Sequence, residues 1–269
     1  MVKFPDTDLD NIVELRGIDQ SYDGGKSYII KDLDFLVENK PDRGQFICIL
    51  GMSGSGKSTL LRYIAGLQEP TAAGTILVNQ KPLSKDNRVS MVFQQYSSLP
   101  WMSVLDNVGL ALKFKGVDKQ ERDEKAMEMI EIMGLAGHEH KYAQYPTLSG
   151  GQLQRVAIGR SLLANSDILL MDEPFGALDV KTRLQMQDLV LGIFEKLHPT
   201  IIFVTHDISE AVYLADDIYI LKSAPSHFAE HIHVDLPLHR DRNTKRDPRF
   251  IELVHEVEDR MVAVAVAEL

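Results

Sequence analysis

Short apolar runs rich in β-branched residues alternate with segments of helical periodicity along most of the chain. The runs of strand length cover residues 11–16, 29–37, 45–50, 75–79, 89–93, 168–172, 200–205 and 217–222. The helical patterns cover residues 57–67, 119–133, 151–163, 181–197, 208–215 and 249–262. The later strands are uniformly apolar, which is typical of parallel strands covered on both faces. The pattern therefore predicts an α/β fold around a mostly parallel sheet.

The order of these elements also predicts how the domain is organised. Residues from about 95 to 165 hold helices and loops but no convincing strand, which indicates an α-helical subdomain inserted between two strands of the sheet. We therefore predict one domain over residues 9–225 that contains this insertion. Residues 226–269 are predicted to form a tail with a strand, a linker and a helix.

Composition and charge narrow the classes of function. The 269 residues include 39 Asp and Glu against 29 Lys and Arg, a formal net charge of −10. Proteins that bind nucleic acid or dock on anionic lipid use clustered basic residues, so this balance argues against both. No apolar run approaches the roughly 20 residues of a membrane-spanning helix, and the first residues, MVKFPDTDLDN, lack the apolar stretch of a secretory signal. We expect a soluble intracellular chain without an anchor, and a buried, inert thiol at Cys48.

A glycine-rich loop carries the strongest chemical signal. Residues 51–59, GMSGSGKST, fit the pattern G-x-x-x-x-G-K-[ST] between a predicted strand and a predicted helix. Glycines let successive N–H groups point inward as an anion nest, and the helix adds partial positive charge at its N-terminus. Lys57 suits the β- and γ-phosphates of a nucleotide and the Ser58 hydroxyl suits Mg²⁺; the alternative is a flexible glycine loop. The predicted phosphate-binding residues are Gly51, Ser53, Gly54, Ser55, Gly56, Lys57, Ser58 and Thr59. The helix is expected to carry Leu60, Leu61, Ile64 and Leu67 on one face.

Two carboxylates follow the apolar run 168–171. Consecutive strand residues point to opposite faces, so Asp172 and Glu173 can do different work. Asp172 is predicted to join the Mg²⁺ shell, and Glu173 to orient or deprotonate an attacking water. The alternative is an ordinary acidic surface turn. Beside a phosphate loop, the sequence favours the catalytic interpretation.

The segment LSGGQ at residues 148–152, followed by the helical run LQRVAIGRSLL, resembles the signature motif of ATP-binding cassette (ABC) ATPases. Other residues resemble further family motifs in the expected order. They are Tyr22 as the residue that stacks on adenine, Gln94 as the Q-loop glutamine, Asp179 in the D-loop and His206 as the switch histidine. The resemblance covers roughly residues 11–222. It implies a P-loop NTPase (RecA-like) core with an antiparallel β subdomain and an inserted α-helical signature subdomain.

The resemblance also implies a mechanism. In the family, the signature of one subunit closes over the phosphate loop of another, so Ser149, Gly150, Gly151 and Gln152 would contact ATP bound to a second ATPase subunit, either an identical copy or a close paralogue. Gln94 would reach Mg²⁺ or the attacking water, and His206 the γ-phosphate; each also has a plain structural alternative. Asp179 would connect the paired sites. The expected ligands are ATP and Mg²⁺, and the expected activity is ATP hydrolysis.

Residues 99–108, LPWMSVLDNV, are similar to the LPW-x-x-V-x-x-NV pattern of ATPases from nitrate, sulfonate and taurine importers. This likeness implies membrane permease partners, an extracytoplasmic substrate-binding protein, and a location on the cytoplasmic face of the cell membrane. Leu99 and Trp101 would contact the permease; the alternative places Trp101 in the core of the subdomain. An exporter or lipid-trafficking ATPase, and a soluble ABC ATPase of DNA repair or translation, are the competing functions.

The remaining features indicate structure rather than chemistry. Met127, Met129 and Met133 share helical spacing and are predicted to fill core. His231 and His233 share one strand face, but the sequence offers them no evident acidic partner. Residues 239–249 are expected to form a solvated linker.

Overall fold

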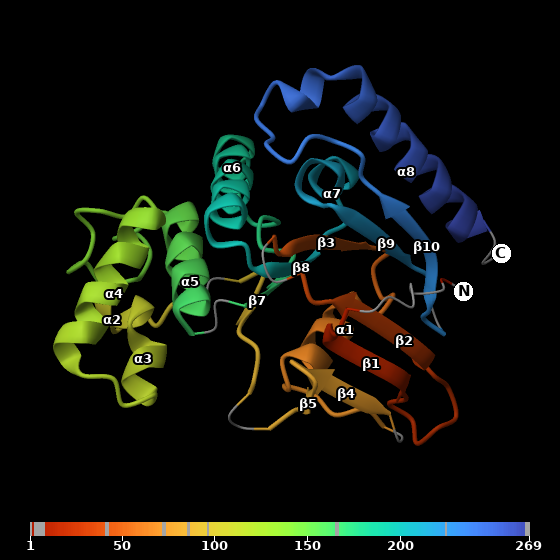
Figure 1. Ribbon diagram of the computed structural model, residues 1–269, viewed down its shortest axis with the longest axis horizontal. Helices are drawn as coiled ribbons and strands as arrows, with labels where there is room; N and C mark the ends of the chain where they lie inside the picture. The colour runs from red at the N-terminus through yellow and green to blue at the C-terminus, as the bar shows by residue number, and fades with distance from the viewer. Residues whose placement is uncertain are drawn as a thin grey trace. The chain divides into compact units, whose positions relative to one another are not determined.

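The structure is a computed structural model that describes residues 2, 9–40, 43–71, 74–84, 87–95, 97–164, 167–223 and 225–266. The expectation for the first eleven residues therefore lies largely outside the described part. The chain divides into two compact units: unit 1 is Met1–Val89 with Thr200–Leu269, and unit 2 is Ser90–Pro199 (Figure 1). Within the described residues, no helix has the length and apolar character needed to cross a membrane.

Unit 1 contains an antiparallel sheet with strand order β2-β1-β4-β5. Its strands are β1 (Asn11–Gln20), β2 (Ile30–Glu38), β4 (Thr75–Val78) and β5 (Lys81–Pro82). In β2 the apolar residues Leu33, Phe35 and Val37 are buried while Asp32 and Asp34 are exposed, which is the alternation expected of a sheet with one covered face. The sequence did not predict β5, because two residues that include a proline carry no strand pattern.

The other sheet strands of unit 1 lead to the glycine-rich loop. They follow the order β10-β9-β3-β8, with β3 parallel to both β8 and β9 and β10 antiparallel to β9. Their bounds are β3 (Gln45–Leu50), β8 (Thr200–Val204), β9 (Asp217–Leu221) and β10 (Phe228–His233). Every residue of β3, β8 and β9 is buried, which explains why each strand is continuously apolar after its first residue. Cys48 lies in this core, and burial raises the pKa of its thiol.

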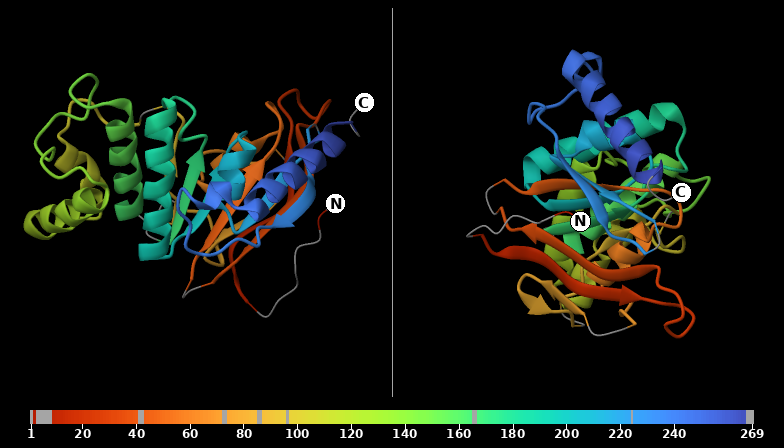
Figure 2. Two further views of the ribbon diagram at one scale, coloured as in Figure 1. Left: turned by 90° about the horizontal axis from the view of Figure 1, so that it is seen from above. Right: turned by 90° about the vertical axis from the view of Figure 1, so that its right-hand side faces the viewer.

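The helices of unit 1 are α1 (Lys57–Ile64), α7 (Ile208–Leu214) and α8 (Pro248–Val266), with a short 3₁₀ turn, η1 (Thr244–Arg246). Figure 2 shows α8 running beside β10 and α7, and it buries Phe250, Leu253 and Val257. The solvated-linker prediction is wrong at Arg240, which is buried and donates to the carbonyls of Tyr213 and Ala215.

The predicted helix 57–67 ends earlier than its pattern. Gly66 has a φ of 67°, and Leu67 N donates to Arg62 O as the chain turns away. A left-handed glycine of this kind is a common helix terminator. Leu67 therefore lies outside α1 and is exposed, so its predicted place on the helix face is wrong, whereas Leu60, Leu61 and Ile64 lie in α1 and are buried.

Unit 2 contains the parallel strand pair β6 (Met91–Val92) and β7 (Ile168–Asp172) together with helices. The helices are α2 (Val104–Val108), α3 (Leu110–Phe114), α4 (Lys119–Ile132), α5 (Gly150–Ala164) and α6 (Val180–Leu197). Between residues 97 and 164, all of them described, no strand is present, as the sequence predicts. Met129 and Met133 are buried and lie beside Gly159 of α5, which confirms their role as core residues, whereas Met127 is only half-buried.

Candidate functional site

The phosphate loop connects β3 to α1 and folds around the side chain of Lys57. Lys57 Nζ donates to the carbonyl oxygens of Gly51 and Met52 at 2.8 and 2.9 Å, and the residue is only 6% exposed. A buried ammonium group is stable only when it is paired or hydrogen-bonded. The loop thus holds a positive charge at a fixed place at the start of α1.

Glycine is required at several points of this loop. A Cβ on Gly51 would lie 2.6 Å from the Leu221 carbonyl, and Gly54 and Gly56 have φ values of 84° and 87°. A Cβ on Gly56 would also come within 3.3 Å of Ser226. Residues with side chains rarely adopt such backbone angles. The glycine spacing seen in the sequence therefore has a direct steric cause.

One buried hydroxyl of the loop has no hydrogen-bond partner among the described residues. The Ser55 hydroxyl is fully buried and has no partner among the described residues. Gly56, the residue before α1, provides no side-chain cap, whereas α2, α4, α6 and α7 are capped by Ser103, Asp118, Asp179 and Asp207. A buried polar group without a partner costs about 1–3 kcal/mol. An anion with several oxygens, such as a phosphate, fits both the hydroxyl and the uncapped N–H groups.

Tyr22 lies in a tight loop of unit 1 between β1 and β2, and 64% of its surface is exposed. Asp23 organises this loop by accepting hydrogen bonds from the backbone N–H groups of Lys26 and Ser27 and from the Ser27 hydroxyl. Hydrogen bonds to the Asp23 carboxylate hold its pKa far below its ordinary range, and the bond from the Ser27 hydroxyl has the largest effect. The Tyr22 hydroxyl accepts a hydrogen bond from Gln68 Nε2 at 3.0 Å. The ring is therefore both open to solvent and held in place.

In unit 2, the predicted acidic pair and the predicted glutamine occupy one small region. Glu173, directly after β7, has a φ of 44°, a left-handed conformation that costs a residue with a side chain about 1–3 kcal/mol. The Gly176 N–H donates to Glu173 O at 3.1 Å, and a Cβ on Gly176 would lie 3.0 Å from Gln94 Nε2. Gln94 thus lies beside the loop that begins with Glu173, and strain concentrates at the residue predicted to act on water.

The signature segment opens α5 with a reciprocal cap. Gln152 N donates to Ser149 Oγ at 3.3 Å, and Ser149 N donates to Gln152 Oε1 at 2.9 Å, the arrangement of a capping box. A Cβ on Gly151 would lie 2.4 Å from Thr182 of α6, so this glycine allows two helices to approach. Ser149 is exposed and Gly150 is half-buried. The start of α5 is accessible without any other change in unit 2.

Asp179 and His206 lie at helix starts in different units. Asp179 caps α6, with its carboxylate accepting from Thr182 N at 3.0 Å and from the Thr182 hydroxyl at 2.6 Å. The Thr182 hydroxyl is the main cause of the lowered pKa of Asp179. His206 is exposed between β8 and Asp207, the cap of α7. Unit 1 therefore contains Tyr22, the phosphate loop and His206, and unit 2 contains the remaining predicted site residues.

The structure supplies a partner that the sequence did not reveal. His231 Nε2 and His233 Nδ1 lie 2.9 and 3.2 Å from Asp217 Oδ1, and Gln45 Nε2 donates to Asp217 Oδ2 at 2.9 Å. The statement that these histidines lack an acidic partner is therefore wrong. The antiparallel register pairs His233 with Asp217, so a correct hairpin alignment of β9 and β10 could have found it.

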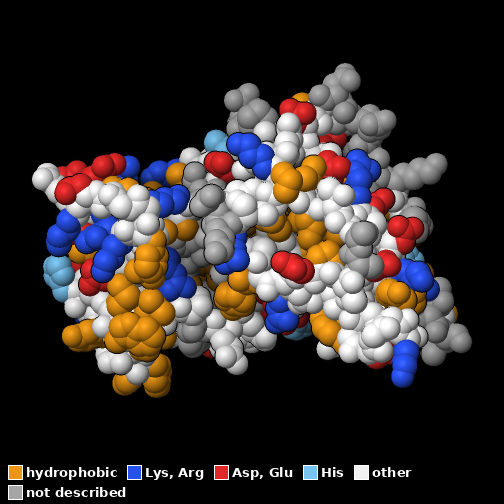
Figure 3. All heavy atoms as spheres, turned by 90° about the horizontal axis from the view of Figure 1, so that it is seen from below, with side chains coloured by type: hydrophobic (Ala, Val, Ile, Leu, Met, Phe, Trp, Pro, Cys, Tyr) orange, Lys and Arg blue, Asp and Glu red, His pale blue; other side chains and the backbone are white. Residues whose placement is uncertain are grey.

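A pocket of about 250 Å³ lies on unit 2. It is lined by Ser90, Met91, Leu110, Ala111, Phe114, Arg160, Ser161 and Ala164. Phe114 is 82% exposed. Figure 3, which views the molecule from below the orientation of Figure 1, shows hydrophobic side chains gathered on unit 2. Trp101, in the loop before α2, is 71% exposed, so its alternative assignment to the core is wrong.

Comparisons with known proteins agree on one family. The family described as ABC transporter matches residues 36–176. The chain is 40% identical to the Nitrate import ATP-binding protein NrtD of Synechocystis sp. over 87% of this chain and 88% of that protein. It is 39% identical to the Taurine import ATP-binding protein TauB of Pseudomonas fluorescens over 90% of this chain and 91% of that protein. A solved dimer of the ATP-binding cassette MJ0796 in a post-hydrolysis state, bound to ADP and Pi, matches with a TM-score of 0.69 and 30% identity, over 84% of this chain and 100% of that one.

Proposed function

The chain belongs to the ABC transporter family and is an ATP-hydrolysing transport ATPase, and from this premise we propose that it drives the uptake of a small anionic solute through a membrane permease. The observation that carries the nucleotide part is the phosphate loop, whose buried Ser55 hydroxyl has no partner in the described part of the chain and whose helix has no side-chain cap. The predicted loop residues would take the phosphates of ATP, with Lys57 as their fixed positive charge.

Mg²⁺ fits the donor chemistry of the proposed site. The Ser58 hydroxyl and the Asp172 carboxylate are oxygen ligands, and Mg²⁺ is usually bound through one or two protein oxygens together with substrate phosphates. When bound, the ion would neutralise charge on the phosphates. We assign these two residues as its protein ligands, with Gln94 as a third candidate.

Hydrolysis requires a group that takes a proton from the attacking water. We assign this role to Glu173, whose backbone is held in a strained left-handed conformation. Gln94, beside the same loop, would orient the water, and His206 would donate a hydrogen bond to the γ-phosphate. Tyr22 would stack on adenine.

One chain carries one phosphate loop and one signature segment. We propose that two cassettes pair head to tail, so that Ser149, Gly150, Gly151 and Gln152 of one chain meet the ATP of the other. The solved relatives of the cassette fold that form dimers support this arrangement. Asp179 would link the two sites across the dimer.

The direction and the solute are inferred from the relatives. Two independent sets of importer ATPases, named for nitrate and for taurine, align with about nine-tenths of this chain. Nitrate and taurine share a compact, charged oxyanion group, so a small oxyanion is the solute class we propose. An extracytoplasmic substrate-binding protein would select it, and the chain would act at the cytoplasmic face of the membrane through its permease.

The permease contact is assigned to unit 2. The pocket beside Phe114 and the exposed Trp101 give this unit apolar surface that a helix of the permease would cover. We expect Trp101→Ala to lower solute uptake severalfold at an unchanged melting temperature. Leu238→Ala, an exposed hydrophobic residue of unit 1, is the matched control and should leave uptake unchanged. Normal uptake by the Trp101 variant would remove this residue from the contact.

The decisive experiment measures transport. Cells that lack this chain, and the same cells carrying it, are supplied with isotopically labelled nitrate or taurine in separate assays. We expect the intact chain to restore ATP-dependent uptake of one oxyanion, and a Glu173→Gln chain to fail. If efflux changes while uptake of every oxyanion stays the same, the exporter alternative replaces this proposal.

A further inference from the structure

Gln68 lies in the segment that follows α1, and its amide contacts Tyr22. Gln68 Nε2 donates to the Tyr22 hydroxyl at 3.0 Å and lies 3.2 Å from Gln20 Oε1, which it also uses as an acceptor. The residue was not singled out from the sequence, because 46 positions separate it from Tyr22. It joins an exposed aromatic ring to the interior of unit 1.

The interior end of this connection is rigid. Gln20 is buried, and its Nε2 donates to Ser21 O at 3.1 Å. Tyr63, a buried residue of α1, donates its hydroxyl hydrogen to Gln20 Oε1. Burial raises the pKa of Tyr63, so its hydroxyl remains a donor. Gln68 therefore ties the Tyr22 hydroxyl to the helix that begins at Lys57.

A second contact from the same segment fixes the backbone next to Tyr22. Ser21 N donates to the Thr71 hydroxyl oxygen at 3.0 Å, and the same hydroxyl donates to Ser21 O at 3.0 Å. Thr71 thus holds the backbone before Tyr22, Asp23 organises the turn after it, and Gln68 holds the hydroxyl of the ring. The Tyr22 side chain therefore has one preferred direction.

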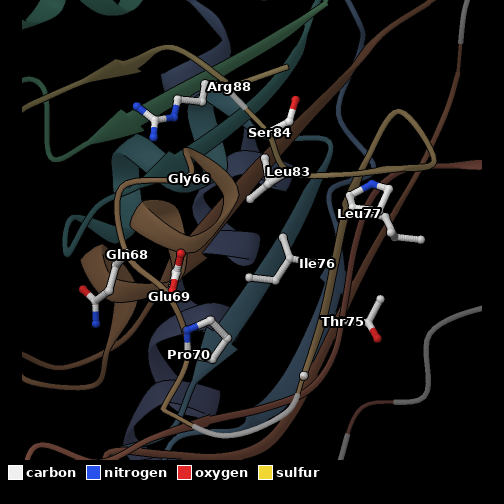
Figure 4. A pocket seen from close by; sticks show the side chains of 12 residues that line it. Gly66, Gln68, Glu69, Pro70, Thr75, Ile76, Leu77, Leu83, Ser84 and Arg88 are labelled. Atoms are coloured by element: carbon white, nitrogen blue, oxygen red, sulfur yellow. The ribbon is translucent and has the colours of Figure 1, made fainter. Parts of the chain in front are cut away.

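Gln68 can be changed without opening the core. It lines a pocket of about 510 Å³ whose opposite wall includes Ile76 and Leu77, and Figure 4 shows the Gln68 side chain directed away from both. Because the Gln68 side chain is only half-buried, loss of its amide removes hydrogen bonds and leaves no enclosed cavity.

We propose that Gln68 is a positioning residue that holds the Tyr22 ring in the direction in which it stacks on adenine. The inference rests on the proposed function, in which Tyr22 is the adenine-stacking residue. A ring that is already fixed before binding loses little rotational freedom on contact with the base. Immobilising one free side chain costs up to about tenfold in affinity, so Gln68 contributes an effect of that size to ATP and none to the phosphates alone.

The test compares ATP with inorganic triphosphate, which lacks the base, by calorimetry on the full chain. We expect Gln68→Leu to weaken ATP binding about fivefold to tenfold and to leave triphosphate binding unchanged. Tyr22→Phe, which removes only the hydroxyl, should match it, and the double variant should be no weaker than either single one. In steady-state hydrolysis, KM for ATP should rise while kcat stays constant. Glu69→Ala, an exposed neighbour, is the control and should bind both ligands normally.

Three results would overturn the proposal, and they are distinguishable. If Tyr22→Ala weakens ATP binding but Gln68→Leu does not, Gln68 has no positioning role and the proposed function stands. If Gln68→Leu weakens triphosphate as much as ATP, the residue acts on the shape of α1. If Tyr22→Ala leaves ATP binding unchanged, Tyr22 is not the adenine contact, and that part of the proposed function fails together with the inference.

Discussion

The phosphate loop of unit 1 and the signature segment of unit 2 are both helix starts suited to an anion, yet the chain prepares them differently. Helix α1 follows a glycine that provides no side-chain cap, and the Ser55 hydroxyl before it is buried and unpartnered within the described residues. Helix α5 begins with a closed capping box between Ser149 and Gln152. The first site leaves donors for a ligand, whereas the second satisfies its own.

The two segments therefore depend differently on a ligand. Unpaired buried donors are costly, so the phosphate loop gains stability when an anion arrives. The capped start of α5 is stable without a ligand and is accessible, which suits a surface offered to another molecule. The loop should therefore bind nucleotide in a single chain, while the signature segment should matter only when two chains meet.

The largest expected effect separates ATP hydrolysis from nucleotide binding at the phosphate loop and from pairing through the signature segment. Glu173→Gln removes the proposed base while keeping its size, so the rate of ATP hydrolysis should fall by about 10²–10⁴-fold. Single-chain ATP affinity should stay the same, because the phosphate loop is untouched. Steady-state hydrolysis and calorimetry measure the two quantities. An unchanged hydrolysis rate would exclude Glu173 as the base.

The next effect tests the loop itself. Lys57→Ala removes the fixed ammonium group, and the lost charged hydrogen bonds should weaken ATP and inorganic triphosphate about tenfold to hundredfold each. Lys81→Ala, on the exposed edge strand β5 of the same unit, is the control for a simple loss of charge. If both variants bind triphosphate like the unchanged chain, the phosphate loop is not the anion-binding site of a single chain.

A smaller effect tests the signature segment. Ser149→Ala opens the capping box and should lower the free energy of unfolding by about 1 kcal/mol. Asp118→Ala removes the cap of α4 in the same unit and should cost a similar amount. Only the Ser149 variant should also lower ATP hydrolysis, and only at concentrations where chains pair; gel filtration with ATP measures pairing. Equal hydrolysis by both variants would show that Ser149 acts only as a cap.

The sequence predicted the central elements well, for a physical reason. Strands β3 and β7 have the predicted bounds, because buried parallel strands are continuous apolar runs that end at polar residues. The two-residue strand β5 and the five-residue helices α2 and α3 are too short to carry a period. Leu67 was misassigned because the apolar period continues past the left-handed Gly66 that ends α1.

Site residues divide in the same way. The phosphate loop could be read from the sequence because its chemistry lies within nine consecutive residues. The contact of Gln68 with Tyr22 and the pairing of Asp217 with His231 join distant positions, and no local pattern encodes them. Contacts of this kind follow from strand register and from where a helix ends, which only the folded chain determines.

A separate prediction concerns the stability of unit 1 at the start of β3, the strand that leads to the phosphate loop. Burial alone would raise the pKa of Asp217, but hydrogen bonds from His231, Gln45 and His233 outweigh it and lower the pKa from 3.8 to about 2. A lowered pKa in the folded state stabilises the fold at pH values above 3.8, and this contribution disappears as the pH falls towards 2.

Asp217→Asn should therefore reduce the free energy of unfolding by about 2 kcal/mol at pH 7, with a difference that shrinks below pH 4. Because Gln45 begins β3, the variant also tests whether the phosphate loop depends on the hydrogen bond between Gln45 and Asp217. Urea unfolding measures the stability, and calorimetry measures the affinity of the loop for inorganic triphosphate. Asp235→Asn, an exposed partner of Arg249, is the control and should change neither. A constant difference between the Asp217 variant and the unchanged chain from pH 7 to pH 3 would contradict the assigned cause.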